Sequence, residues 1–299
     1  MSSLLDLTVQ GDVATTSEDS TLPRVKLMDP LELYRLWERQ NWASHEIDLE
    51  RDRRDWESMP EHLRRELLFG LAGFFVGEER VTSHFSGLVL AAADKHEEAF
   101  LLTQQVDEAR HAQHFNRLYE EVLAVHGSFE DRLDQARGTL GSDYRTLFDG
   151  HLVDAHTALL RDPGDLEAKI AFVTVYHMVI EGTLALTGQH FQSENLERLG
   201  VLPGHRQAFA LIARDEHRHV AYGTWFLQQH VGDPVLAARV RDTFARTLPA
   251  AAGALVPAAS RHRGNDEARA RADREINEFA FNALSRRLKV IGIALPGAT

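Results

Sequence analysis

Residues 107–111 read DEARH and residues 215–219 read DEHRH, so the pattern D-E-x-R-H occurs twice in a chain of 299 residues. In both copies a glutamate and a histidine stand three residues apart. Side chains at this spacing share one face of an α-helix, where both can reach the same metal ion. One copy alone would indicate little, because solvated helix surfaces are rich in Glu and His. The repetition makes the pattern informative.

Each copy follows a glutamate that lies in a strongly apolar segment. Glu78 lies within LAGFFVGEERV (71–81), 30 residues before the glutamate of the first copy. Glu181 lies within AFVTVYHMVIEGTLAL (171–186), 35 residues before the glutamate of the second copy. Burying a carboxylate is costly unless it is paired or bound to a metal. These two glutamates therefore have either a metal or a buried ion partner.

A glutamate followed by Glu-x-x-His, twice over, is the ligand set of ferritin-like bundles that hold two iron or manganese ions. Carboxylate and imidazole groups suit these metals, and shared carboxylates offset the repulsion between two cations. The chance coincidence of buried, ion-paired carboxylates is the competing interpretation. The predicted ligands are Glu78, Glu108, His111, Glu181, Glu216 and His219.

The remainder of the chain is compatible with an all-α, ferritin-like helical bundle with a four-helix metal-binding core plus additional helices. Apolar residues recur at helical spacing, and glycine and proline mark the breaks between segments. We expect a flexible N-terminal tail over 1–25 and one helical domain over 26–299. We expect helices that begin near Pro30 and near Pro60, and helices over about 97–126, 129–161, 166–197 and 205–230, the second of these ranges having a weak point at Gly141. Another helix begins at Asp233, and the last covers 266–290 after a turn at 261–265.

Composition excludes several kinds of chemistry. The chain has no cysteine, which rules out disulfides, zinc–thiolate sites and iron–sulfur clusters and suits a reducing, cytoplasmic location. Its net charge of -12 argues against binding to nucleic acid or to anionic membranes. No signal peptide is visible, and the longest apolar run, near Leu67–Val76, is too short to span a bilayer. We therefore expect no stable membrane insertion.

The segments WASHEIDLERDRRDW (42–56) and MPEHLRRELLFGLAGFF (59–75) resemble the small, radical-generating subunit of ribonucleotide reductase. The resemblance continues through both metal motifs to about residue 230 and includes Arg214-Asp215-Glu216. It implies that Asp215 accepts a hydrogen bond from a ligand histidine, His111, with Trp42 behind it as part of an electron path. Plain core packing of Trp42 is the alternative.

Three features resemble a particular branch, the ligand-binding oxidases related to that subunit. Phe115 stands four residues after the first motif's histidine, where most reductase subunits have a tyrosine. No tyrosine follows Tyr222, whereas the reductase subunit needs one in its C-terminal tail. The third feature is the pair of spacings Glu-x-x-Val, ending at Val81, and Tyr-x-x-x-x-Glu, beginning at Tyr176.

The resemblance implies an oxygen-dependent oxidoreductase with one manganese and one iron, di-iron being the alternative pair. It places manganese beside Glu78 and His111. It further implies a bound long-chain fatty acid, an ether crosslink between Tyr176 and Val81, reaction with dioxygen, and a homodimer. From the residues alone, a hydrogen-bonded Tyr176 and a Val81 in the core are the simpler interpretation.

Other functions stay open at this level. The chain could be a reductase small subunit or a metal-containing lipid-binding protein without turnover, and iron storage has little support. An apolar stripe either forms bundle core or lines an acyl pocket. Its residues are Phe74, Phe75, Ala185, Phe209 and Ile212.

Overall fold

The computed structural model describes residues 26–255 and 267–293, and in these ranges it contains helices and connecting segments but no strand. The predicted tail over 1–25 and the predicted turn at 261–265 lie outside the described residues. The all-α prediction is confirmed. The elements are α1 (Pro30–Arg39), η1 (Ser44–Glu46), α2 (Glu50–Ser58), α3 (Glu61–Ser83), α4 (Ser86–Leu90), α5 (Lys95–Arg117), η2 (Leu118–Val122), α6 (Phe129–Arg137), α7 (Ser142–Arg145), η3 (Thr146–His151), α8 (Leu152–Arg161), α9 (Leu166–Val173), η4 (Thr174–Ala185), α10 (Leu186–Leu199), α11 (Pro203–His230), α12 (Pro234–Ala254) and α14 (Glu267–Ile291).

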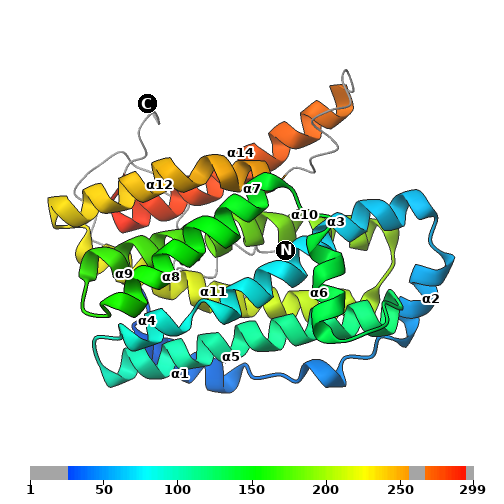
Figure 1. The fold of residues 1–299 in the computed structure, drawn as a ribbon, viewed down its shortest axis with the longest axis horizontal. Coiled ribbons are helices and arrows are strands. Elements are labelled where there is room, and N and C mark those ends of the chain that lie inside the picture. Colours follow the sequence, from blue (N-terminus) through cyan, green and yellow to red (C-terminus); the bar gives the residue numbers. More distant parts are fainter. Residues whose placement is uncertain (1–25, 256–266, 294–299) are drawn as a thin grey trace.

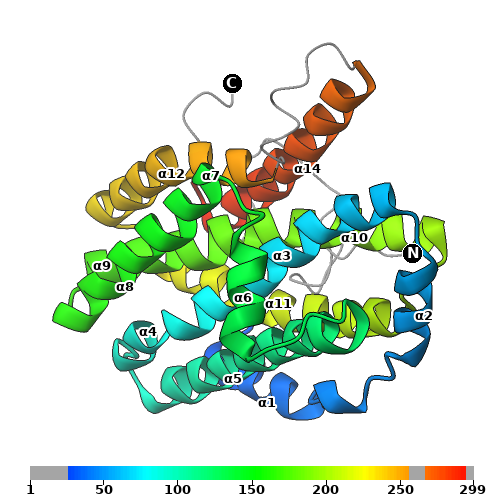
Figure 2. The same ribbon diagram turned by 45° about the vertical axis from the view of Figure 1, so that its right-hand side comes forward.

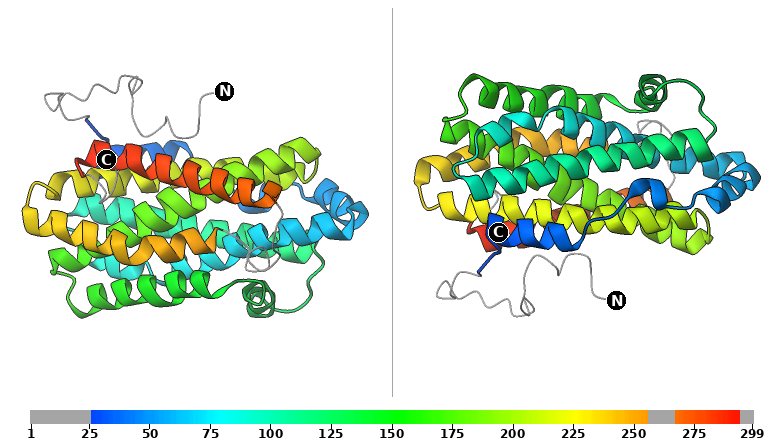
Figure 3. Two further views of the ribbon diagram at one scale, coloured as in Figure 1. Left: turned by 90° about the horizontal axis from the view of Figure 1, so that it is seen from above. Right: turned by 90° about the horizontal axis from the view of Figure 1, so that it is seen from below.

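Four helical columns carry the predicted ligands: α3, α5, the continuous run of α9, η4 and α10, and α11. They lie side by side along the long axis of the molecule (Figure 1). α3 packs on α5, η4 packs on α11, and α10 contacts α3, so the four columns surround a common interior. α1 covers α5 on one side, and α12 and α14 cover η4 on the other (Figure 3).

Side chains cap several of the helices where the sequence supplies an acceptor. Asp94 caps α5 by accepting hydrogen bonds from the backbone N–H groups of His96 and Glu97. Asp233 caps α12 in the same way through Val235. Such caps satisfy N–H groups that have no partner within the helix. The Asp94 cap sets where α5, the column of Glu108 and His111, begins.

α2 was not expected, because its sequence ERDRRDWES has almost no apolar periodicity. It lies across one end of the bundle (Figure 2). Its buried Asp52 accepts hydrogen bonds from the backbone N–H groups of Gly204, at 2.8 Å, and His205, at 2.6 Å. A residue of α2 therefore satisfies the first turn of α11, which has no cap of its own. Burial raises the pKa of Asp52.

Other boundaries differ in detail from the expectation. The helix that begins after Pro60 ends at Ser83, and the short α4 follows it. The weak point at Gly141 is a break between α6 and α7. The segment η4 is π-helical over 12 residues, which the helical periodicity did not predict. π-Helical turns are rare and occur frequently at functional sites.

The column over Leu166–Leu199 is the apolar run that the sequence analysis overlooked. By length and composition it could cross a membrane, but 89% of its most apolar window is buried inside the bundle. Burial of this kind is typical of the central helix of a bundle, which is apolar on all sides.

Candidate metal centre

The structure brings all six predicted ligands together in the interior as two groups. One consists of Glu78, Glu108, His111 and Glu216, and the other of Glu108, Glu181, Glu216 and His219. Within each group the ligand atoms lie within 4.8 Å of one another. Glu108 and Glu216 belong to both groups, so each can bridge two ions. This arrangement matches a dinuclear site with one terminal carboxylate and one imidazole for each ion.

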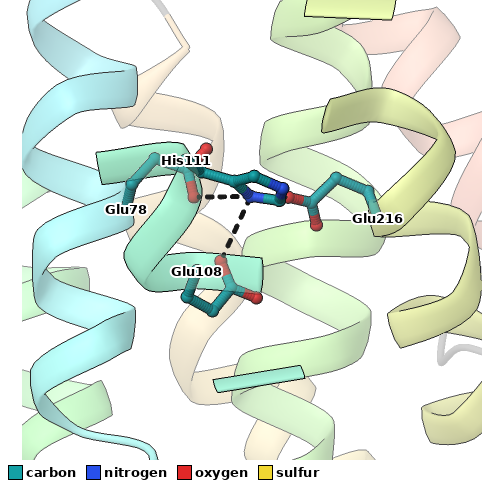
Figure 4. Close-up of side chains that lie close together, drawn as sticks. All are labelled: Glu78, Glu108, His111 and Glu216. Carbon is teal, nitrogen blue, oxygen red and sulfur yellow. Dashed lines mark ion pairs between the residues drawn. The ribbon is translucent and has the colours of Figure 1, made fainter. Parts of the chain in front are cut away.

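Both histidines point the same ring nitrogen at the carboxylates. His111 Nδ1 lies 3.4 Å from Glu78 Oε2 and 3.4 Å from Glu216 Oε1, as Figure 4 shows for side chains from α3, α5 and α11. His219 Nδ1 lies 3.0 Å from Glu108 Oε1 and 3.2 Å from Glu181 Oε1. Nδ1 is therefore the atom that each imidazole would offer to a metal.

The donor set fits a pair of divalent cations. Buried atoms in this cluster lack hydrogen-bond partners among the described residues, including Nδ1 of both histidines and one oxygen each of Glu181 and Glu216. Unpartnered buried polar atoms are costly, and metal bonds would satisfy them. Four carboxylates would also balance the four positive charges of two divalent ions. With oxygen and nitrogen donors only, the set suits iron or manganese.

Protons occupy part of this cluster when cations do not. Burial raises the pKa of Glu78 to about 8 and raises that of Glu181 well above its ordinary value. Burial opposes ionisation of Glu108 as well, but His219 and His111 hold its pKa well below the usual range. Burial opposes the charged imidazoles, yet the surrounding carboxylates raise the pKa of both ligand histidines. Metal binding must therefore release protons.

His111, Asp215 and Trp42 form the hydrogen-bonded chain that the resemblance implies behind the first ligand histidine. His111 Nε2 lies 3.3 Å from Asp215 Oδ2, and Trp42 Nε1 donates to the same oxygen at 2.6 Å. A carboxylate that accepts from a ligand imidazole fixes its tautomer and ring orientation. Burial opposes ionisation of Asp215, but the hydrogen bond from His111 holds its pKa well below the usual range.

The second half of the site has the same arrangement, which the sequence analysis missed. His219 Nε2 lies 3.3 Å from Asp107 Oδ2, and Trp37 Nε1 donates to Asp107 Oδ1 at 2.9 Å. Arg218 joins the two aspartates, with Nη2 at 2.9 Å from Asp107 and 2.6 Å from Asp215. The aspartate at the start of each D-E-x-R-H copy was the available signal. Nothing local to the motif indicated Trp37.

Neighbouring polar residues support the centre without joining it. Gln104 Nε2 donates to Glu181 at 3.2 Å, and its oxygen lies 3.2 Å from His177 Nε2. His114 Nε2 lies 3.1 Å from His205 Nδ1. Burial lowers the pKa of His205 to about 3, so this pair stays neutral. Phe115 is fully buried and stacks on Phe74 at 5.8 Å.

Tyr176 lies beside the centre. It is fully buried, and its hydroxyl donates to Glu108 Oε1 at 2.7 Å. Burial, together with Glu108, raises its pKa well above the ordinary value, so the phenol keeps its proton. Val81 is buried on α3, near the end of that helix.

A largely apolar cavity of about 310 Å³ extends from the centre along the interior. Glu78, Glu108, Glu181 and Glu216 lie at its lining, as does Val81. On α3 the lining reaches back to Glu66, 12 residues before Glu78, which is ~18 Å at the rise of an α-helix. This is the length scale of a long acyl chain.

Of the five residues in the apolar stripe, two line the cavity and three do not. Phe74 and Ala185 are at the cavity wall. Phe75, Phe209 and Ile212 are not, and all three are buried in the core. The ring of Phe74 packs edge-on against Phe209 at 4.8 Å and stands between it and the cavity. Helical spacing placed Phe209 on the correct face of α11 but could not reveal this cover.

Comparison with known proteins agrees with this geometry. The family described as "Ribonucleotide reductase, small chain" matches residues 21–248. A solved R2-like ligand-binding oxidase with aerobically reconstituted Mn/Fe cofactor has 25% identity, covers 87% of this chain and 92% of its own, and superposes with a TM-score of 0.75. A tyrosine-to-phenylalanine variant of such an oxidase has 24% identity, coverage of 88% and 93%, and a TM-score of 0.75. A glycine-to-phenylalanine variant, reconstituted anaerobically, has 24% identity, the same coverage and a TM-score of 0.73.

The structural likeness confirms the ferritin-like fold, and the family match extends over most of the chain. The two Glu and Glu-x-x-His sets project into the core of the four-helix bundle, where ferritin-like proteins bind their two metal ions. The chain therefore belongs to the ribonucleotide reductase small-chain family of dinuclear metal proteins.

Proposed function

We propose that this protein is a dioxygen-activating oxidase with one manganese and one iron, and that it binds a long-chain fatty acid. The observation that carries the proposal is the opening of a long apolar cavity directly onto two metal-ligand groups that share two carboxylates. A paired cation site attracts a carboxylate, and the apolar wall favours an acyl chain. The similarity to R2-like ligand-binding oxidases with a Mn/Fe cofactor supports the same conclusion.

The protein side chains hold this site in one geometry. Asp215 and Asp107 orient the two imidazoles, Gln104 holds Glu181, and the Tyr176 hydroxyl holds Glu108. When bound, the metal pair would supply the activation of dioxygen. The apolar cavity would exclude water from the reacting carbon and limit side reactions.

We also propose that Tyr176 and Val81 become joined by an ether bond. The Cβ–H bond of Val81 and the O–H bond of Tyr176 would break, and a C–O bond would form. Two protons and two electrons leave, and dioxygen accepts them. Both side chains are buried and Val81 lines the cavity. The Tyr176 hydroxyl donates to the Glu108 carboxylate, which belongs to both ligand groups.

A peptide digest tests this link. After aerobic metal loading, the joined peptides should weigh about 2 Da less than their sum, because two hydrogens are lost. Tyr176→Phe should abolish the joined peptide and leave metal binding intact. Separate, unmodified peptides after full loading in air would show that the chain does not make the bond.

The reductase small-subunit function is the second candidate, because the family match is to that subunit. Phe115 counts against it, since it stands where most reductase small subunits have a tyrosine. The third candidate is a lipid-binding protein without turnover. With a fatty acid bound and the metals reduced, an oxidase consumes dioxygen repeatedly, whereas a binding protein without turnover does not.

The decisive experiment blocks the cavity. A Cβ atom built on Gly73 meets only the ring of Tyr144, at 3.9 Å, so a leucine side chain there would enter open space in the cavity. Gly73→Leu should retain two metals per chain and lose the extractable fatty acid. Gly150→Leu is the matched control, because Gly150 faces open space and lies outside the cavity.

The proposal fails if no acyl species is recovered from native protein loaded with both metals. It also fails if both sites fill with iron when manganese is available. Glu108→Ala and Glu181→Ala test the ligands themselves: unchanged binding of two metals in both variants would refute the assignment.

A further inference from the structure

One polar side chain in the cavity wall is unlike its counterparts elsewhere in the protein. Thr187 on α10 lines the cavity and is only 1% exposed, yet its hydroxyl has no hydrogen-bond partner among the described residues. A buried hydroxyl without a partner is costly, because it has lost its hydrogen bonds to water. Such a group in a ligand cavity requires an explanation.

The other described buried threonines all use the ordinary solution. Each donates its hydroxyl to a backbone carbonyl three to five residues earlier in its own helix, at 2.6–2.8 Å. These residues are Thr103, Thr174, Thr183, Thr224, Thr243 and Thr247. Thr187, the seventh buried threonine among the described residues, makes no such bond.

The position of Thr187 along the cavity is defined by its neighbour. A Cβ atom built on Gly188 would lie 3.1 Å from the ring of Phe74, so this part of α10 faces Phe74 on α3. Phe74 precedes Glu78 by four residues, which is ~6 Å along the helix. Thr187 therefore lies about one helical turn from the carboxylates of the metal centre.

A second unpartnered donor lies farther along the same wall. Gln192 lines the cavity, and its buried Nε2 has no hydrogen-bond partner within the part of the chain that the structure describes. Gln192 faces Gly70, eight residues before Glu78 and thus ~12 Å along α3. The Gln192 side chain is long and partly exposed, whereas that of Thr187 is short and buried. Two residues in the wall of this largely apolar cavity therefore carry a polar atom that has no partner among the described residues.

We propose that the bound acid carries a hydroxyl or keto oxygen on its chain, in the half nearer its carboxylate, and that the Thr187 hydroxyl hydrogen-bonds to it. An unsubstituted chain would leave this hydroxyl buried and unpaired. A site built to hydrogen-bond an oxygen discriminates against the analogue that lacks it, because its own polar group then stays unsatisfied. The inference rests on the proposed function and names the substrate class more closely.

The test measures binding of stearic acid and its monohydroxy isomers to protein loaded with manganese and iron. At least one isomer hydroxylated in the carboxyl half should bind about tenfold more tightly than stearic acid. Thr187→Val should reduce that preference to within about twofold, while Thr187→Ser, which keeps the hydroxyl, should retain it. Thr224→Val is the matched control, because Thr224 is equally buried, bonds to Val220 and lies outside the cavity.

The outcomes separate the two claims. If stearic acid binds and no isomer is preferred, or if Thr187→Val leaves a preference unchanged, the role of Thr187 is refuted and the fatty-acid function stands. If none of the acids binds to the metal-loaded protein, the fatty-acid function itself is refuted, and the inference with it.

Discussion

The two aspartates behind the ligand histidines predict a specific pattern of metal loss. Asp107 accepts from His219, Trp37 and Arg218, at 3.3, 2.9 and 2.9 Å. Asparagine has the same shape but only one acceptor oxygen and no charge, so Asp107→Asn cannot satisfy all three donors. The imidazole of His219 then loses its fixed orientation.

Loss of a partner of this kind typically weakens metal affinity by 10–100-fold, which is about 1.4–2.7 kcal/mol. We expect Asp107→Asn to weaken binding of the ion held by His219 by that factor. Asp215→Asn should do the same to the ion held by His111. Trp37→Phe removes one neutral donor and should cost at most about fivefold, from ~1 kcal/mol.

Anaerobic calorimetric titration with manganese, and with iron, measures these affinities, and anomalous scattering at both absorption edges identifies the site that loses its ion. Both substitutions remove a carboxylate that accepts a hydrogen bond from the buried Arg218, which is 2% exposed, and this could destabilise the fold. Thermal unfolding of the metal-free variants controls for that effect. The reasoning is refuted if both substitutions weaken the same ion, or if neither changes affinity by more than twofold.

Three further predictions follow from buried groups and from the family. Burial lowers the pKa of His205 to about 3, whereas its value in the unfolded chain is about 6.5, so between these two values only the unfolded chain binds the proton and the free energy of unfolding falls as the pH is lowered below about 6.5. At pH 4.5 the loss is about 2.7 kcal/mol. Urea unfolding at several pH values should therefore show a weaker pH dependence for His205→Gln than for the wild type. Lys169 Nζ donates to the buried carboxylate of Glu97 at 2.9 Å. Lys169→Met should lower the free energy of unfolding by about 3 kcal/mol, because the carboxylate stays buried and keeps only the Tyr222 hydroxyl and a backbone N–H as donors. An unchanged denaturation midpoint would contradict this. The chain should be a homodimer, as the resemblance implies, and light scattering that finds only monomer at micromolar concentration would contradict it.

The ligand set could be predicted from the sequence because its information is local. Glu108 and His111 are placed on one helix face by a spacing of three residues, whatever the rest of the chain does. Glu78 and Glu181 were identified because a charged group within a long apolar helix is costly without a partner. The two copies of the motif each carry half of the frame, so their helices had to meet. The structure brings the six side chains together as that argument required.

What only the tertiary structure decided are contacts between side chains on different columns. Trp37 and Asp107 are 70 residues apart, and no spacing along either helix relates them. Phe209 has the right periodicity for a cavity wall, yet Phe74 covers it. The buried hydroxyl of Thr187, just after the π-helical segment η4, has no partner among the described residues, and no spacing along α10 indicated this. Helical periodicity fixes which face of a helix is apolar, whereas the rotation and separation of packed helices fix what each side chain on that face meets.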